Sequence, residues 1–311
     1  MPESPCRVGL MAILNATPDS FSDGGQAHGA LLAKAHEAYT ICQRDALLLI
    51  FDVGGQSTRP GATPVSPDEE QARVLPVIRA LKTHYPDTRI SIDTFDARVA
   101  EAALREGASV INDVSGLTHS KQAMARVAAT ASTPLILMHG FSDPESLTKA
   151  AQDKPTELSS ITQRVIPFLQ AQAQHAQQAG VAKQQIWLDP GFGFGKSVND
   201  NLTLLRAIDE LLALGHPLVI GTSRKSFLTL NSFAAANAIV APAERDALTA
   251  ASLAPVIQAL YATQQAQPAM LHPTAGWADV CLWLRVHNVA AMAPVVTFLT
   301  AFYSNAPVLN Q

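Results

Sequence analysis

Cysteine is scarce in this sequence: 311 residues contain only Cys6, Cys42 and Cys281. The three are far apart and odd in number, which excludes the disulfide framework of a small secreted domain. The cysteines and histidines also lack the spacing of a zinc site. We therefore expect the cysteines to be small core residues in a reducing compartment.

Charge is sparse as well. Charged residues make up 15% of the chain, the formal net charge is -4 and the pI is about 6.1. A surface without a basic surplus does not suit nucleic acid or an anionic membrane, so we expect neither as a partner. No apolar run approaches the ~20 residues of a membrane helix, and MPESPCRVGLMAIL lacks the cationic segment of a secretory signal. We expect a cytoplasmic protein.

What the sequence does contain is a regular alternation of short apolar runs and longer, Ala- and Gln-rich stretches. Near-continuous apolar runs are typical of parallel strands buried on both faces. We predict strands at Val8–Leu14, Ala46–Val53, Arg89–Asp93, Ser109–Asp113, Pro134–Met138, Gln185–Asp189, Pro217–Gly221 and Val280–Val286. We predict helices at 29–44, 68–84, 96–107, 119–131, 155–180, 200–214, 242–264 and 290–303.

Eight strand-then-helix units predict an α/β protein built as a single (β/α)8 TIM barrel, with a parallel, closed, eight-stranded sheet. The alternative is a doubly wound open sheet, which has fewer strands. No linker divides the chain, so we predict one domain over residues 1–311. The segment 264–279 is predicted to be an insertion before the eighth strand, on the face of the barrel away from the site.

Polar side chains gather where the predicted strands end. These residues are Asn15, Asp52, Asp93, Asn112, Asp113, His139, Asp189, Ser223, Arg285 and His287. The starts of the strands carry nothing comparable. Because active sites of TIM barrels lie at the carboxyl ends of the strands, this pattern indicates a site at that face.

Seven motifs carry a family resemblance. They are ILNATPDSFSDGG, FDVGGQSTRPGA, SIDTF, INDVSG, LDPGFGFGKS, GTSRKSFL and LRVHNV. Taken in order, they closely resemble the dihydropteroate synthase family, over about residues 8 to 290. The resemblance implies a (β/α)8 barrel that joins p-aminobenzoate to 6-hydroxymethyl-7,8-dihydropterin pyrophosphate and releases pyrophosphate with the help of Mg2+.

One cluster suits a pterin ring. Carboxylates such as Asp93 and Asp189 accept hydrogen bonds from a guanidine-like edge in bidentate fashion, and the Asn112 amide both donates and accepts. The resemblance assigns these three residues to the pterin pocket, together with Met138 and Lys225. A single aspartate at a strand end is alternatively a helix N-cap, and that alternative applies to Asp96 and Asp113.

A second cluster suits an anion. Arg59, Arg285 and His287 would form an anion clamp, because the guanidinium fork matches phosphate oxygens. The resemblance places the pyrophosphate there, with Asn15 as the residue near the metal. The alternatives are a strand-end salt bridge for Arg285 and a buried structural histidine for His287.

A third group suits p-aminobenzoate. Lys225 is predicted to open a helix flanked by Ser223 and Ser226, and a helix N-terminus can receive a carboxylate. The resemblance implies that Ser226 binds that carboxylate and that the ring is surrounded by Phe21, Thr58, Pro60 and Phe194. Ser226 is alternatively only a helix cap. We predict the catalytic residues to be Asp93, Asp189, Lys225, Arg285 and His287.

The glycines of DPGFGFGKS do not match two familiar nucleotide motifs. A P-loop requires a glycine where Pro190 stands, and Gly191, Gly193 and Gly195 lack the spacing of a dinucleotide fingerprint. We interpret them as a flexible turn that lets Gly193 and Phe194 lie along a substrate ring. Residues 17–25 and STRPGA are interpreted as two mobile loops over the site.

Three residues depart from the family pattern: Gln56 replaces the usual Glu, Asn288 the usual Asp, and Gly140 a usual Met. Gln56 and Asn288 each remove a charge near the site, which keeps open a weakly active or non-catalytic pterin-binding paralogue. A methyltetrahydrofolate-type methyltransferase is the other alternative, although it does not require STRPGA or SRKSF.

Members of the family are commonly dimers, and the predicted helix 290–303 carries apolar residues that could form the interface. The alternative for that helix is ordinary packing on the barrel. We predict a homodimer.

Overall fold

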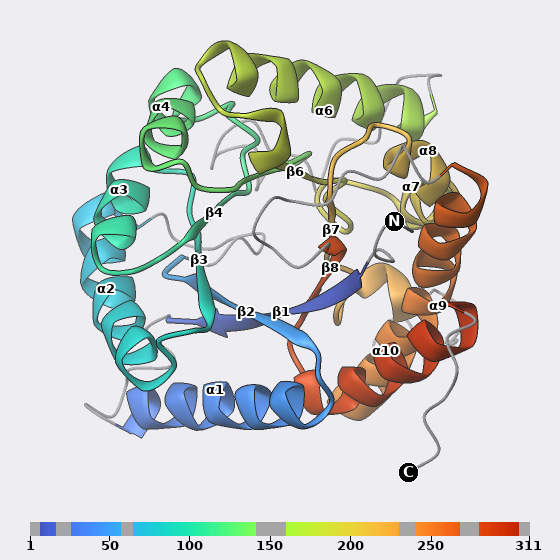
Figure 1. Ribbon diagram of the computed structural model, residues 1–311, viewed down its shortest axis with the longest axis horizontal. Coiled ribbons are helices and arrows are strands. Elements are labelled where there is room, and N and C mark those ends of the chain that lie inside the picture. Colours follow the sequence, from blue (N-terminus) through green and yellow to red (C-terminus); the bar gives the residue numbers. More distant parts are fainter. Residues whose placement is uncertain are drawn as a thin grey trace, which may run out of the picture.

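The structure is a computed structural model that describes residues 7–16, 26–56, 65–140, 160–229, 240–267 and 280–304. Its strands close into a parallel barrel in sequence order, each paired with the next and β8 paired with β1 (Figure 1). The strands are β1 (Arg7–Asn15), β2 (Leu48–Gly54), β3 (Arg89–Asp93), β4 (Val110–Asp113), β5 (Leu135–Met138), β6 (Ile186–Asp189), β7 (Leu218–Ile220) and β8 (Val280–Val286). The TIM barrel is confirmed, and each predicted strand agrees with the observed one to within two residues at either end.

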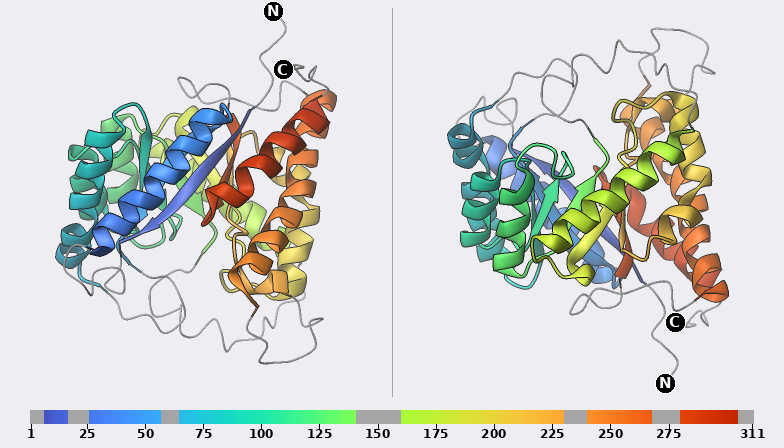
Figure 2. Two further views of the ribbon diagram at one scale, coloured as in Figure 1. Left: turned by 90° about the horizontal axis from the view of Figure 1, so that it is seen from below. Right: turned by 90° about the horizontal axis from the view of Figure 1, so that it is seen from above.

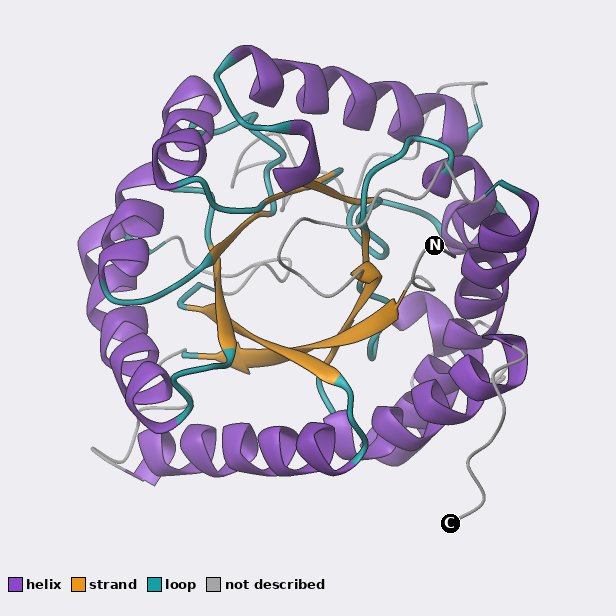
Figure 3. Cartoon of the chain, viewed as in Figure 1, coloured by secondary structure: helices purple, strands orange, loops and turns teal. Residues whose placement is uncertain are grey.

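Helices surround the sheet as an outer ring (Figures 2 and 3). They are α1 (Gln26–Arg44), α2 (Pro67–His84), α3 (Ala97–Arg105), α4 (Lys121–Ala131), α6 (Ile161–Gln178), α7 (Val198–Arg206), α8 (Ile208–Leu212), α9 (Pro242–Ala266) and α10 (Val289–Ser304), with short 3-10 helices η2 (Lys183–Gln185) and η3 (Ser226–Thr229). The single helix predicted at 200–214 is wrong. It is divided between α7 and α8 because Ala207 has φ -105° and ψ 25°, which interrupts the α-helix.

Side chains that begin these helices explain their boundaries. Ser66 accepts a hydrogen bond from the Glu69 amide at the start of α2, and Asp96 accepts one from the Arg98 amide at the start of α3. Each side chain satisfies an amide that has no partner within its helix. Asp96 is therefore an N-cap, as its alternative interpretation states.

The interior of the barrel is apolar at one level and polar at the next. Met11, Ile50, Val110, Ile136, Trp187, Val219, Val280 and Trp283 form a buried cluster in which the two indole rings stack with centroids 5.7 Å apart. Two residues further along the chain from seven of these residues lie four polar side chains, Asp52, Asn112, Asp189 and Arg285, together with Ile13, Met138 and Gly221. Since alternate residues of a strand share a face, the apolar cluster is the floor beneath those side chains.

A larger apolar layer joins the sheet to its helices. It includes Phe51 and Leu188 on the strands and Val77, Leu169 and Val256 on the helices. Among the described residues, no helix is long and apolar enough to cross a membrane. The cytoplasmic location and the predicted insertion at 264–279, most of which lies outside the described residues, stay predictions.

The cysteines are only partly as expected. Cys42 is free and buried. Cys281 is disulfide-bonded, so the expectation that all three cysteines are unpaired is wrong.

Candidate active site

The carboxyl ends of the strands bring five polar side chains to the mouth of the barrel: Asp52, Asp93, Asn112, Asp189 and Arg285. The strand register places Asp93 beside Gly54 on one side and Asn112 on the other, and it pairs Asp189 with Met138. We call these five residues the polar tier. Three of the predicted pterin-binding residues, Asp93, Asn112 and Asp189, thus lie at the carboxyl ends of their strands, at the same mouth of the barrel.

Arg285 is the centre of the polar tier. Its Nε lies 2.6 Å from Asp52 Oδ2 and its Nη2 lies 2.5 Å from Asp93 Oδ2. Burial opposes the charge of Arg285, but Asp52, Asp93 and Asp189 together outweigh it and raise the pKa of the guanidinium above its usual value. The salt bridge considered as the alternative for Arg285 is therefore present in the structure. Its assignment to a pyrophosphate clamp stays a prediction.

The polar tier contains three carboxyl groups but only one guanidinium group. Burial raises the pKa of Asp93 to about 7, against the attraction of Arg285. Burial also raises the pKa of Asp189 to about 6, although the Gly191 amide donates to its Oδ1 at 2.7 Å. Three carboxyl groups and one guanidinium leave the tier with more hydrogen-bond acceptors than donors, and with more negative than positive charge when all three carboxyl groups are ionised.

Asn112 has an acceptor to offer. Its Nδ2 lies 3.4 Å from Asp52 Oδ2, whereas its buried Oδ1 has no hydrogen-bond partner among the described residues. A buried carbonyl without a donor is costly, by roughly 1–3 kcal/mol. Its position beside Asp93 suits a ligand that presents N–H groups.

Beside the polar tier lies a cationic corner around His287. Ser223 Oγ lies 3.1 Å from His287 Nδ1 and also accepts a hydrogen bond from the His287 amide at 3.1 Å. Burial, together with the positive charges of nearby Lys34, Arg285, Arg224 and Lys225, lowers the pKa of His287 to about 3. The imidazole is therefore neutral near pH 7, and the positive charge of this corner belongs to the lysines and arginines.

Lys225 connects the two regions. Its Nζ lies 3.9 Å from the centre of the Phe194 ring, a cation–π contact. Its positive charge also opposes the rise that burial causes in the pKa values of Asp93 and Asp189. In place of the helix predicted to begin at Lys225, the described residues form only the short 3-10 helix η3. Ser226, the first residue of η3, is exposed.

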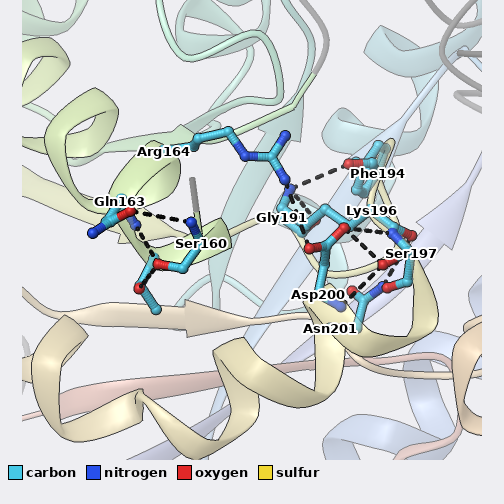
Figure 4. Close-up of polar contacts among 10 residues, drawn as sticks. Ser160, Gln163, Arg164, Gly191, Phe194, Lys196, Ser197, Asp200 and Asn201 are labelled. Atoms are coloured by element: carbon cyan, nitrogen blue, oxygen red, sulfur yellow. Dashed lines mark hydrogen bonds and ion pairs between the residues drawn. The ribbon is translucent and has the colours of Figure 1, made fainter. Parts of the chain in front are cut away.

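The glycine-rich turn is held more firmly than predicted. Lys196 Nζ donates to the carbonyls of Gly191 and Phe194 at 2.8 and 3.2 Å (Figure 4). It also donates to the His139 carbonyl at 2.9 Å. The Gly193 amide donates to Asn201 Oδ1 at 2.7 Å. Gly191, Gly193 and Gly195 all have positive φ, the left-handed region that other residues rarely adopt. The turn is thus fixed by hydrogen bonds from Lys196 and to Asn201, and it places the Phe194 ring against Lys225.

Phe21, Thr58, Arg59 and Pro60 lie outside the described residues, so the pairing of Arg59 with Arg285 stays a prediction. Asn15 ends β1 and is exposed at the mouth of the barrel. Asp113 accepts from the Ser115 and Leu117 amides at 2.9 Å each, which gives it a structural role in the turn after β4.

The sequence pattern identified Asp52 at a strand end without giving it a role, and it did not indicate Lys34 or Lys196. Asp52 is 1% exposed and pairs with Arg285, and FDVGG gave a signal for it as a strand-end carboxylate. Lys34 donates to the Ile13 carbonyl at 2.7 Å, and Lys196 holds the glycine-rich turn. Neither lysine could be found from strand ends, since one comes from helix α1 and the other from a loop.

Comparisons with known proteins decide the family. A family model described as "Pterin binding enzyme" matches residues 11–262. A dihydropteroate synthase of Synechocystis sp. is 46% identical over 222 residues, which cover 71% of this chain and 73% of the relative. The chain belongs to the dihydropteroate synthase family.

Solved structures of dihydropteroate synthases agree over nearly the whole chain. One from Clostridium difficile, in the presence of pteroic acid, is 34% identical with a TM-score of 0.76 and covers 97% of this chain and 99% of its own. One from Xanthomonas albilineans, with 4-aminobenzoic acid, is 32% identical with a TM-score of 0.74 and covers 98% and 95%. The prediction of a dihydropteroate synthase, an enzyme of the transferase class, is confirmed.

Proposed function

We propose that this dihydropteroate synthase condenses p-aminobenzoate with 6-hydroxymethyl-7,8-dihydropterin pyrophosphate through two adjoining parts of its site. The observation that carries the proposal is the position of the acidic polar tier directly beside the cationic corner around His287. The dihydropterin pyrophosphate has two ends that match these two parts: a ring rich in hydrogen-bond donors for the polar tier and a diphosphate for the cationic corner. Asp93, Asn112 and Asp189 would bind the ring, with Met138 at its apolar edge.

The leaving group belongs at the cationic corner. Loss of pyrophosphate from the methylene carbon is the difficult step, because negative charge collects on the departing oxygen. Arg285, Lys225 and Lys34 would stabilise that charge, and the neutral His287 would donate one hydrogen bond to it. Preorganised donors and cations of this kind can contribute several kcal/mol to catalysis. The carboxylates of Asp93 and Asp189 would favour the positive charge that develops on the ring.

The residues present fit a magnesium ion carried mainly by its substrate. Among the described residues, no group of three His, Cys, Asp or Glu side chains is arranged to hold a metal, and Asp52 and Asp93 are paired with Arg285. Mg2+ keeps several waters and often binds through substrate phosphates with one or two protein oxygens. Asn15, at the end of β1, would supply such an oxygen. When bound, the ion would neutralise charge on the pyrophosphate.

The second substrate would approach along the glycine-rich turn. Phe194, Gly193 and Ser226 lie on segments that flank Lys225, and Phe21, Thr58 and Pro60 would complete this side of the site. The arylamine is neutral at pH 7, so its nitrogen can attack the methylene carbon as the carbon–oxygen bond breaks. The amine then releases one proton. Most of the acceleration would come from positioning and from stabilising the leaving group.

Pyrophosphate release tests this proposal. The purified protein should release one pyrophosphate for each 7,8-dihydropteroate formed, only when both substrates are present, and more slowly when Mg2+ is removed by a chelator. A non-catalytic pterin-binding protein would bind the dihydropterin without releasing pyrophosphate. That result would overturn the proposal.

We also propose that the chain forms a homodimer through α10. Val296 and Leu299 pack into the barrel, whereas Phe298 and Phe302 are 65% and 64% exposed and their rings stack with centroids 5.9 Å apart. Large exposed aromatic rings on one helix face are typical of an interface. Light scattering after gel filtration should give a mass near 66 kDa, twice the 33.0 kDa chain, and Phe298→Glu should give a monomer. A monomeric wild-type protein would contradict the dimer.

A further inference from the structure

Two segments of the site meet at matching positions. Ser223, after β7, contacts His287, after β8, through the hydroxyl contacts described above. The residues that follow them, Arg224 and Asn288, are also joined, but through a third side chain. That side chain is Asp246, on helix α9.

Asp246 receives three hydrogen bonds from the two segments. Arg224 donates from Nε to Oδ1 at 2.7 Å and from Nη2 to Oδ2 at 2.8 Å, and Asn288 Nδ2 donates to Oδ2 at 2.8 Å. The Asp246 side chain is buried, with 6% of the residue exposed. The hydrogen bonds from Arg224 lower the pKa of Asp246, so it is ionised near neutral pH. Asn288 Oδ1 in turn accepts from the Ala291 amide at the start of α10.

Arg224 needs such support because of its backbone. Its φ is +57°, a left-handed conformation that costs a residue other than glycine roughly 1–2 kcal/mol. Helix α9 holds it twice, through Asp246 at the side chain and through Thr249 Oγ1, which accepts from the Arg224 amide at 3.1 Å. The reversal of the chain at Arg224 separates Ser223, which contacts His287, from Lys225, which contacts Phe194.

We propose that Asp246 is a positioning residue for the reaction. Its carboxylate fixes Arg224 in the left-handed conformation and ties the Ser223–Lys225 segment to His287 and Asn288. Lys225 and His287 are thereby held at the cationic corner in the geometry that the leaving group requires. This inference rests on the roles proposed above for those two residues.

The position of Asn288 allows the carboxylate to be moved. Because Arg224 and Asn288 donate to the same oxygen of Asp246, a carboxylate at position 288 would lie beside the same guanidinium. Asp246→Asn combined with Asn288→Asp therefore exchanges the two side chains and keeps one negative charge between the two segments. An aspartate at position 288 would also accept from the Ala291 amide, at a helix N-terminus that favours negative charge.

Steady-state kinetics of pyrophosphate release test the inference. Asp246→Asn should lower kcat about tenfold and weaken product inhibition by pyrophosphate to a similar extent. The KM for p-aminobenzoate should change less than twofold. The double variant Asp246→Asn/Asn288→Asp should recover most of the lost kcat. Glu244→Gln is the matched control, since it makes the same chemical change on the exposed face of α9 and should leave kcat unchanged.

Folding is measured in parallel by thermal unfolding. If Asp246→Asn reduces the folded fraction, Arg224→Lys is used as the test variant in its place. Because an ammonium pairs less specifically with the Asp246 carboxylate, kcat of Arg224→Lys should fall about threefold or more. Unchanged kcat per folded protein would overturn the inference, as would a loss that the double variant fails to reverse. His287→Ala separates the two proposals. If His287→Ala leaves kcat unchanged, the proposed function of the cationic corner is wrong. If His287→Ala lowers kcat but Asp246→Asn does not, only the positioning role of Asp246 is wrong.

Discussion

Arg285 Nη2 lies 2.5 Å from Asp93 Oδ2, so an ion pair from β8 to β3 spans the mouth of the barrel above two intervening strands. Together with Asp52 it fixes the level at which the substrate ring would rest. A buried guanidinium shared between two carboxylates is held in place by its fork geometry, which a lysine cannot reproduce.

Arg285→Lys should therefore be severe. The variant should lose at least 100-fold in kcat/KM and about 3 kcal/mol in free energy of unfolding, because one buried carboxylate is left without its partner. Urea unfolding and pyrophosphate release measure the two effects. Arg79→Lys is the control, since Arg79 pairs with Glu106 at the surface and the same change should cost less than about 1 kcal/mol there. Equal losses in both variants would contradict the account.

The pH dependence follows from the raised pKa values of Asp93 and Asp189, which are about 7 and about 6. As the pH falls through these values, the carboxyl groups take up protons and lose acceptor capacity. We expect kcat/KM for the dihydropterin substrate to fall on the acidic side between pH 7 and pH 6. Asp93→Asn should lower the plateau and remove the upper part of this fall. A profile that is flat from pH 5.5 to pH 8 would show that neither carboxylate must be ionised.

Lys196 gives a test of the glycine-rich turn. Lys196→Met removes three hydrogen bonds to main-chain carbonyls and should cost about 2–4 kcal/mol of unfolding free energy. Because the turn carries Phe194, the KM for p-aminobenzoate should rise about tenfold. Lys183→Met, at an exposed lysine of η2, should change neither quantity. If KM were unchanged in Lys196→Met, the turn would not need this lysine to bind its substrate.

Gly9 tests the floor of the site. A Cβ at this position would lie 2.3 Å from the Trp283 ring, so Gly9→Ala should lower the unfolding free energy by about 1–3 kcal/mol. Gly29→Ala, on α1 with open space around it, should instead raise it by about 0.5–1 kcal/mol. Denaturant unfolding of both variants distinguishes packing at the floor from the general effect of replacing glycine.

The sequence predicted the barrel and much of the site because both depend on strands. Apolar runs located the strands, and polar residues at their carboxyl ends pointed to Asp93, Asn112 and Asp189. Since parallel strands in a closed barrel end at one face, order along the chain was enough to predict that these side chains converge.

Features that depend on contacts between distant elements could not be predicted in this way. The strand pattern predicted the position of Arg285, but it could not show whether its partner is Asp52 or a bound anion. Asp246 lies within a helix, and nothing in its local sequence indicates that Arg224 and Asn288 meet it. The neutral state of His287 likewise follows from burial among cations on other elements, which the motif RVHN does not reveal.

The proposed function depends above all on binding of the dihydropterin by the polar tier. The most direct test is kcat/KM for dihydropterin pyrophosphate in Asp189→Asn, measured by pyrophosphate release at pH 7.5 with the thermal midpoint recorded for the same sample. We predict a loss of at least 100-fold, because the ring loses a charged acceptor. The thermal midpoint should not fall, because the buried carboxylate that is removed was itself costly to bury. An unchanged kcat/KM in folded Asp189→Asn would contradict this role of the polar tier.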